Sequence, residues 1–98
     1  MTTQKQFPKV DLIGVGDRLR LVRESFELNS GDFARSIQVD PSSYSKIEKG
    51  EKPLKMEMGF KVAEIYGVTM DYLYRGRLVD IPEKVLAHHR QSLKNQPQ

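Results

Sequence analysis

Hydrophobic residues recur with the period of an α-helix along most of the chain. Val15, Leu19, Val22 and Phe26 lie at i, i+4, i+7 and i+11. They therefore line one face of a first helix that we expect to begin at Val15 and to end near Leu28. No stretch alternates hydrophobic and polar residues as a half-buried strand does. The pattern predicts an all-α protein.

Start and stop signals divide the following stretch into two short helices. Asn29 is a predicted N-cap, because its side-chain oxygen can accept a hydrogen bond from a free amide of the first turn. Asp40 and Pro41 begin a helix that we expect to reach Lys49, with Gly50 as its stop. The predicted buried positions of these two helices are Phe33, Ala34, Ile37, Tyr44 and Ile47.

Three further helices are predicted after Pro53. The fourth ends at Gly67, and the fifth spans Met70–Tyr74 with Thr69 as its cap. The sixth begins within residues 80–83, where an aspartate precedes a proline. We expect the inner face of the fourth helix to consist of Met56, Phe60, Ala63 and Tyr66.

The composition is that of one small globular domain. Hydrophobic residues make up 38% and charged residues 30% of the 98 residues, an ordinary balance for a folded protein. No apolar run approaches the length of a membrane span, and residues 1–6 lack the apolar stretch of a signal peptide. The chain has no cysteine, which excludes disulfides and thiolate metal sites. These features predict a cytoplasmic protein with no membrane contact.

The net charge of +3 is too small to identify a polyanionic partner by itself. The placement of the basic residues is more informative than their number. Lysines recur at every third position from 46 to 55, and three arginines lie close together between positions 18 and 23. Most such runs are a solvated face, so they gain meaning only from their structural context.

A tight turn between two short helices within a five-helix bundle is the arrangement of a helix-turn-helix. The residues also resemble the Cro/cI-type (XRE) repressor family in order and spacing over about residues 14–76. The segments that carry the resemblance are Val15–Glu24, Phe33-Ala34, Val39, Tyr44–Gly50, Val62-Ala63, Gly67-Val68 and Met70–Gly76. The resemblance implies a lambda-repressor-like DNA-binding domain at residues 10–78. A flexible arm is expected at residues 1–9, and an additional C-terminal helix and tail at residues 79–98.

In that family the second helix of the motif enters the DNA major groove. The resemblance therefore places Pro41, Ser42, Ser43 and Lys46 at base edges, with Ser45 as a further candidate. Pro41 departs from the family, which often has a glutamine there that can pair with adenine. Serine hydroxyls discriminate bases poorly, so Lys46 is expected to carry the strongest direct readout, of guanine. A plain phosphate contact or a solvated side chain is the alternative for Lys46.

Phosphate contacts are expected from helix starts and flanking side chains. The candidates are Lys9, Asn29, Ser30, Lys49 and Lys52. Ser30 stands where the family often has a glutamine that touches the DNA backbone. Family members usually pair the positions of Arg23 and Glu48 as ions, so the resemblance implies that these two residues link the first helix to the recognition helix.

No residues of the chain form a recognisable catalytic or metal-binding pattern. His88 and His89 are the only histidines, and neighbouring positions on a helix point in different directions. No nucleophile context or glycine-rich phosphate loop is present. The chain is therefore predicted not to be an enzyme and to need no cofactor. Four large side chains are expected in the core, since stacking on bases suits single strands better than a duplex: Phe33, Tyr44, Met56 and Phe60.

The resemblance implies a sequence-specific regulator, commonly a repressor, of bacterial or phage origin that binds an inverted-repeat operator as a homodimer. Two alternatives keep the fold. The chain could be an antitoxin that holds a toxin partner and represses its own operon. It could also be an interaction module without DNA binding, which Pro41 and the short serines would favour. Apolar residues of the C-terminal segment either cover the core or, as we expect, form the dimer contact: Leu78, Val79, Ile81, Val85 and Leu86.

Overall fold

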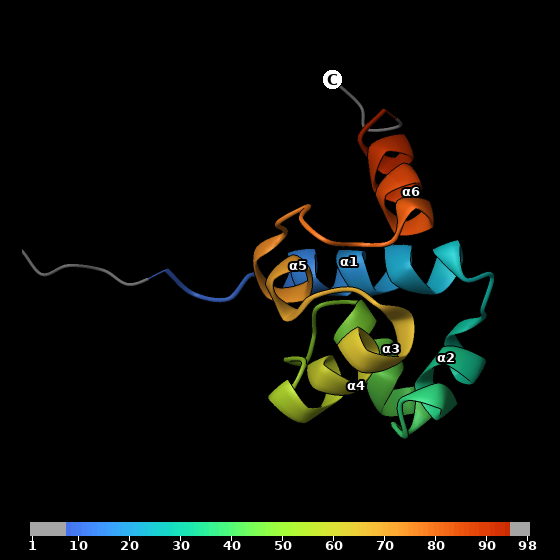
Figure 1. The fold of residues 1–98 in the computed structure, drawn as a ribbon. Helices are drawn as coiled ribbons and strands as arrows, with labels where there is room; N and C mark the ends of the chain where they lie inside the picture. The colour runs from blue at the N-terminus through green and yellow to red at the C-terminus, as the bar shows by residue number, and fades with distance from the viewer. Residues whose placement is uncertain (1–7, 95–98) are drawn as a thin grey trace, which may run out of the picture.

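The computed structural model describes residues 8–94, and six helices make up the ordered elements of this range (Figure 1). They are α1 (Leu12–Ser25), α2 (Ser30–Ser36), α3 (Pro41–Glu48), α4 (Met56–Tyr66), α5 (Met70–Arg75) and α6 (Glu83–Lys94). Residues 8–94 contain no strand, and the predicted all-α fold of five helices and an additional C-terminal helix is confirmed. Most of the arm predicted at residues 1–9, and the end of the predicted tail, lie outside the described residues.

The first helix begins at Leu12, earlier than the expected Val15. Its N-cap is Asp11, whose carboxylate accepts a hydrogen bond of 3.1 Å from the amide of Gly14. The apolar face starts one turn later, because Ile13 is exposed while Val15 is buried. The periodicity therefore marked where the buried face begins, and the capping residue marks where the helix begins.

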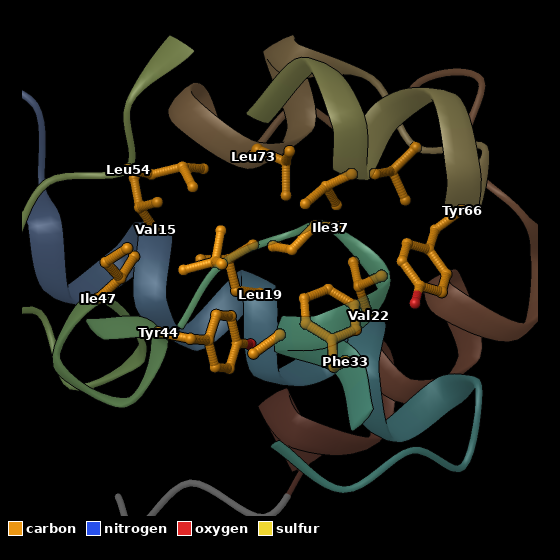
Figure 2. Packing of buried hydrophobic residues seen from close by; sticks show 14 of the residues in the cluster. Val15, Leu19, Val22, Phe33, Ile37, Tyr44, Ile47, Leu54, Tyr66 and Leu73 are labelled. Atoms are coloured by element: carbon orange, nitrogen blue, oxygen red, sulfur yellow. The ribbon is translucent and has the colours of Figure 1, made fainter. Parts of the chain in front are cut away.

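The hydrophobic core lies between α1 and the four helices that follow it (Figure 2). Val15, Leu19 and Val22 of α1 are buried, as the sequence pattern predicted. The ring of Phe33 lies between two tyrosine rings, 5.2 Å from that of Tyr44 and 4.8 Å from that of Tyr66, measured between centroids. This aromatic cluster joins α2, α3 and α4 in one core.

The predicted inner face of α4 was wrong. Met56 and Phe60 were expected in the core, but their side chains are 74% and 56% exposed. Val62 and Tyr66, one turn apart, face the core instead. The sequence offers two apolar faces on this helix, and Met58, Val62 and Tyr66 form the one that is turned inward. Tyr66 is thus the only member of the predicted set that is buried.

A close contact at Gly59 fixes this rotation of α4. A Cβ atom at Gly59 would lie 2.9 Å from the hydroxyl oxygen of Tyr74, so the tyrosine ring packs directly on the helix backbone. The Tyr74 hydroxyl donates a hydrogen bond of 2.6 Å to the carbonyl oxygen of Leu54, which is buried just before α4. This contact is tertiary, so the periodicity of α4 alone does not reveal it.

The additional helix α6 packs on α1, on the side away from α2 and α3 (Figure 1). Val85 is fully buried and belongs to the core. The ammonium group of Lys84 lies 3.7 Å from the centroid of the Phe26 ring. The rings of His89 and Tyr72 form a T-shaped pair, with centroids 6.0 Å apart. Burial lowers the pKa of His89, and the charge of Arg18 contributes a smaller decrease. No helix of residues 8–94 is long and apolar enough to cross a membrane.

The five C-terminal residues expected at a dimer contact divide into two groups. Val85 is a core residue of the single chain, which corrects its expected place on a free surface. Ile81 and Leu86 are half-buried, and Ile81 packs against the core. Leu78 and Val79 remain exposed, at 42% and 62%. Val85 thus covers the core of its own chain, and the dimer contact of the exposed residues of this segment stays a prediction.

Candidate nucleic-acid interface

A tight turn at residues 37–40 joins α2 to α3. The amide of Val39 donates a hydrogen bond of 2.9 Å to the carbonyl oxygen of Ala34, which folds the chain back onto α2. Gln38 adopts a left-handed backbone conformation, with φ of 60°. Ile37 and Val39 are buried on either side of it. The turn therefore fixes the orientation of α3 relative to α2, as a helix-turn-helix requires.

The outward face of α3 carries four polar side chains. Ser42, Ser45, Lys46 and Lys49 lie at i, i+3, i+4 and i+7 and so share one side of the helix. Ser42, Lys46 and Lys49 are exposed, and Ser45 is half-buried. Pro41, at the start of the helix, is also exposed. The structure thus brings four of the five predicted base-contacting residues, together with Lys49, onto the open side of α3.

Ser43 lies apart from the other predicted base contacts. It is half-buried and lines a hollow of about 300 Å³ together with Ile47 and Met58. This hollow separates α3 from the start of α4. Ser43 is therefore placed at the edge of the outward face, next to α4.

The N-terminus of α3 is held by Asp40. Its carboxylate accepts hydrogen bonds from the amides of Ser42 and Ser43, at 3.1 and 3.2 Å, and from the Ser42 hydroxyl. The bond from this hydroxyl, followed by that from the Ser43 amide, lowers the pKa of Asp40. Because its proton is used in the bond to Asp40, the Ser42 hydroxyl has only its lone pairs left for a further hydrogen bond. The sequence left open whether Ser42 donates or accepts, and this arrangement makes it an acceptor.

The start of α2 is built from Asn29 and Ser30. The Oδ1 atom of Asn29 accepts a hydrogen bond of 2.8 Å from the amide of Asp32. Because the cap uses the Oδ1 atom of Asn29, the NH₂ group of the same side chain is the part that can donate to a phosphate. Ser30 follows directly and is exposed. Both predicted phosphate contacts therefore lie at one exposed helix start.

A polar groove of about 360 Å³ separates the outward face of α3 from α1 and α2. Its lining residues are Ile13, Asp17, Arg20, Arg23, Ser30, Ser45, Glu48 and Lys49. Two predicted phosphate contacts, Ser30 and Lys49, thus share this groove with Arg20. The Arg20 guanidinium is held 3.2 Å from Asp17 in an exposed ion pair, which is a weak restraint. Arg20 is not among the contacts predicted from the sequence, although the arginine cluster of the first helix was a signal for it.

The other two lysines flank the interface. Lys9 precedes α1 and is exposed, at the beginning of the described residues. Lys52 follows α3 and lines the hollow next to Ser43. Its charge makes a small further contribution to the lowered pKa of Asp40, so its ammonium group lies near the start of α3.

An ion pair braces the recognition helix from behind. The Nη2 and Nε atoms of Arg23 lie 2.6 and 3.1 Å from the two carboxylate oxygens of Glu48, so the pair is bidentate. Nη1 of Arg23 also donates to the carbonyl oxygen of Leu28, at 3.1 Å. The two charged side chains are only 16% and 14% exposed. The hydrogen bonding of Arg23 to the Glu48 carboxylate raises the pKa of Arg23. One side chain of α1 thereby holds both the loop before α2 and the end of α3.

The backbones of α1 and α3 touch at Gly16. A Cβ atom there would lie 2.2 Å from the carbonyl oxygen of Glu48. Only glycine permits this approach. The contact and the ion pair of Arg23 therefore act on the same last turn of α3.

Comparison with known proteins identifies relatives of this fold. The restriction-modification controller protein C.AhdI from Aeromonas hydrophila is similar, with a TM-score of 0.60 and 25% identity over 65% of this chain and 97% of that protein. The clp gene regulator ClgR from Corynebacterium glutamicum has a TM-score of 0.60 and 19% identity, covering 88% of this chain and 84% of that chain. A second ClgR structure has a TM-score of 0.57 and 20% identity, with coverages of 91% and 100%. The ClgR likeness supports the fold alone.

No curated protein sequence is a significant match to the chain. The family model described as Helix-turn-helix matches residues 19–73, more than half of the 98 residues. This range contains α2, the turn, α3 and α4, together with the second half of α1 and most of α5. The chain therefore belongs, as its sequence resemblance predicted, to the XRE-type helix-turn-helix family of DNA-binding transcriptional regulators.

Proposed function

We propose that the chain is a sequence-specific repressor that binds an inverted-repeat operator as a homodimer, with α3 in the major groove. The observation that carries this proposal is the outward face of α3, where Ser42, Ser45, Lys46 and Lys49 share one side of an exposed helix. A two-fold dimer matches an inverted repeat because each subunit then meets one half-site in the same way.

Each polar group of the interface takes the role that its geometry suits. Lys46 is the long donor at the centre of the face and reads guanine O6 and N7. Ser42, as an acceptor, suits an amino group such as cytosine N4 or adenine N6. Pro41 offers only apolar contact, and Ser45 lies at the rim of the polar groove. The phosphate contacts are Lys9, Asn29, Ser30, Lys49 and Lys52, and we add Arg20 because it lines the same groove as Ser30 and Lys49.

Replacement of Lys46 by alanine is expected to weaken binding to the preferred operator by about 1–3 kcal/mol and to relax specificity at one base pair. The measurement is the affinity of the variant, by fluorescence anisotropy, for a set of operators with single-base changes. Lys49→Ala is the matched control, since a phosphate contact should weaken binding equally for all operators. Uniform weakening by Lys46→Ala would contradict its role in base readout.

The salt dependence of DNA affinity tests the phosphate contacts. Each neutralised phosphate adds about 0.9 to the magnitude of the slope of log affinity against log salt concentration. We therefore expect a steep slope for a mixed-sequence duplex, reduced by about 1 per half-site in Lys49→Ala and in Lys52→Ala. Lys94→Ala, on α6 at the far side of α1, should leave the slope unchanged. A flat plot for the unmodified chain would argue against a phosphate-dominated surface.

A further inference from the structure

The exposed side of α4 carries apolar side chains that the core does not use. A shallow groove of about 380 Å³ on this side is lined by Met56, Glu57, Phe60, Lys61 and Met70, which we call the α4 face. Met56 and Phe60 are among the most exposed large hydrophobic residues of the described chain. Exposed apolar side chains gathered in one groove beside charged residues are suited to contact with another protein surface.

We infer that the α4 face is the surface through which two copies of this chain pair. The inference rests on the proposed function in one respect, since it supplies the contact of the proposed homodimer. A second copy is the occupant because the surface complements itself. A two-fold contact brings the same patch of both subunits together, so each feature of the patch must meet its complement on an identical surface.

The charges of the α4 face meet this requirement. Glu57 and Lys61 are one helical turn apart and lie on the same side of α4. When two copies of α4 run antiparallel across a two-fold axis, Glu57 of one copy lies opposite Lys61 of the other, twice per dimer. Within the single chain, Lys61 donates a 3.0 Å hydrogen bond to the Gln38 side chain. That bond is exposed, so exchanging it for an intersubunit ion pair costs little.

The apolar residues complement one another in the same arrangement. Phe60 stands between the two charged residues, next to the groove floored by Met56 and Met70. The antiparallel pairing directs the ring of each Phe60 toward the methionines of the partner copy. Methionine side chains adapt to the shape of an inserted ring, and a central aromatic residue is the usual anchor of such contacts.

The position of α4 also brings the basic loop before it into the proposed dimer contact. Dimers of this kind hold their recognition helices about 34–36 Å apart. The start of α4 lies beside α3 across the hollow that Ile47 and Met58 line. Lys52 and Lys55 stand in the loop between the two helices, so pairing through α4 places the basic loops of both subunits between their recognition helices.

Pairing through α6 would place the two recognition helices far apart. α6 lies beyond α1 as seen from α3 (Figure 1). Packed helix axes are about 8–10 Å apart, so an α6 contact would separate the two α3 helices by about 40–50 Å.

The test places a negative charge on each candidate surface. Phe60→Glu is expected to weaken self-association of the full chain by about tenfold or more, as measured by analytical ultracentrifugation without DNA. Val79→Glu is the matched control, because Val79 is an equally exposed apolar residue of the C-terminal segment, at 62% against 56%. At a concentration where the unmodified chain is monomeric, both variants should keep its melting temperature. A dimer that Val79→Glu disrupts and Phe60→Glu leaves intact would overturn the inference, as would an unmodified chain that stays monomeric at every concentration.

Charge exchange tests the two-fold arrangement itself. Glu57→Lys alone should weaken the dimer, and Glu57→Lys with Lys61→Glu should restore it. No recovery in the double variant would overturn the antiparallel pairing. Binding of Phe60→Glu to a single half-site separates the two proposals. If Phe60→Glu loses the dimer and keeps its half-site affinity, both the α4 pairing and the proposed function are supported. If the unmodified chain forms a dimer but does not bind DNA, the α4 pairing stands and the proposed function fails.

Discussion

Arg23→Ala is expected to lower the free energy of unfolding by about 3 kcal/mol, because it leaves the carboxylate of Glu48 without its partner in a poorly solvated site. The lower end of the range for buried pairs applies, since the Glu48 side chain keeps 14% exposure. The carbonyl oxygen of Leu28 loses its hydrogen bond as well. For a domain of this size, the loss corresponds to a fall in melting temperature of at least about 12 °C.

Thermal and urea denaturation followed by circular dichroism measure this effect. Arg20→Ala is the matched control, because Arg20 lies on the same helix in an ion pair whose side chains are 40% and 50% exposed. Its removal should change stability by less than about 1 kcal/mol. A melting temperature for Arg23→Ala equal to that of the unmodified chain would show that the pair does not brace α3.

Gly16→Ala is expected to destabilise the fold by at least about 2 kcal/mol, although alanine favours a helix by about 1 kcal/mol over glycine. The added Cβ would lie 2.2 Å from the carbonyl oxygen and 2.8 Å from the carbonyl carbon of Glu48. These are backbone atoms, which cannot rotate away as a side chain can. α3 must therefore move away from α1, and the Arg23–Glu48 pair must lengthen. DNA affinity should fall together with stability.

Gly31→Ala is the control for this substitution. A Cβ atom added at Gly31 would lie 3.2 Å from its nearest neighbour, the Nη2 atom at the end of the flexible Arg35 side chain. The helix preference of alanine should then dominate, and the stability of Gly31→Ala should equal or exceed that of the unmodified chain. If Gly16→Ala were as stable as Gly31→Ala, the close approach of α1 and α3 would not be a constraint on the fold.

Local signals in the sequence predicted most helix boundaries. Asn29, Asp40 and Thr69 each accept the hydrogen bond from a first-turn amide that their residue types suggested. Gly67 and Gly76 end helices with φ of 78° and 76°. These signals depend on a few neighbouring residues, and the sequence displays them directly.

The errors concern contacts between distant segments. α4 has two apolar faces, and the packing of Tyr74 on Gly59 selects the one that carries Val62. The apolar stripe of α6 likewise does not reveal which surface it packs against. In the structure, Val85 of this stripe packs into the core of its own chain. A pattern within one helix identifies a face, but the partner of that face is set by the rest of the fold.

The candidate site shows the same division. The outward face of α3 follows from helical spacing and the family resemblance, which place Ser42 and Lys46 together. The acceptor role of Ser42 depends on the orientation of its hydroxyl toward Asp40, which only coordinates reveal. The contribution of Arg20 to the polar groove depends on how α1 lies against α3.

Selection of bound duplexes from a random DNA pool, at two salt concentrations, tests the central claim most directly. We expect enrichment of an inverted repeat whose half-site centres lie about 34–36 Å apart, with a conserved guanine at the base pair where Lys46→Ala loses discrimination. Recovery should be greater at the lower salt concentration. Failure to enrich any sequence at either salt concentration would contradict the claim and would assign the outward face of α3 to a protein partner instead of DNA.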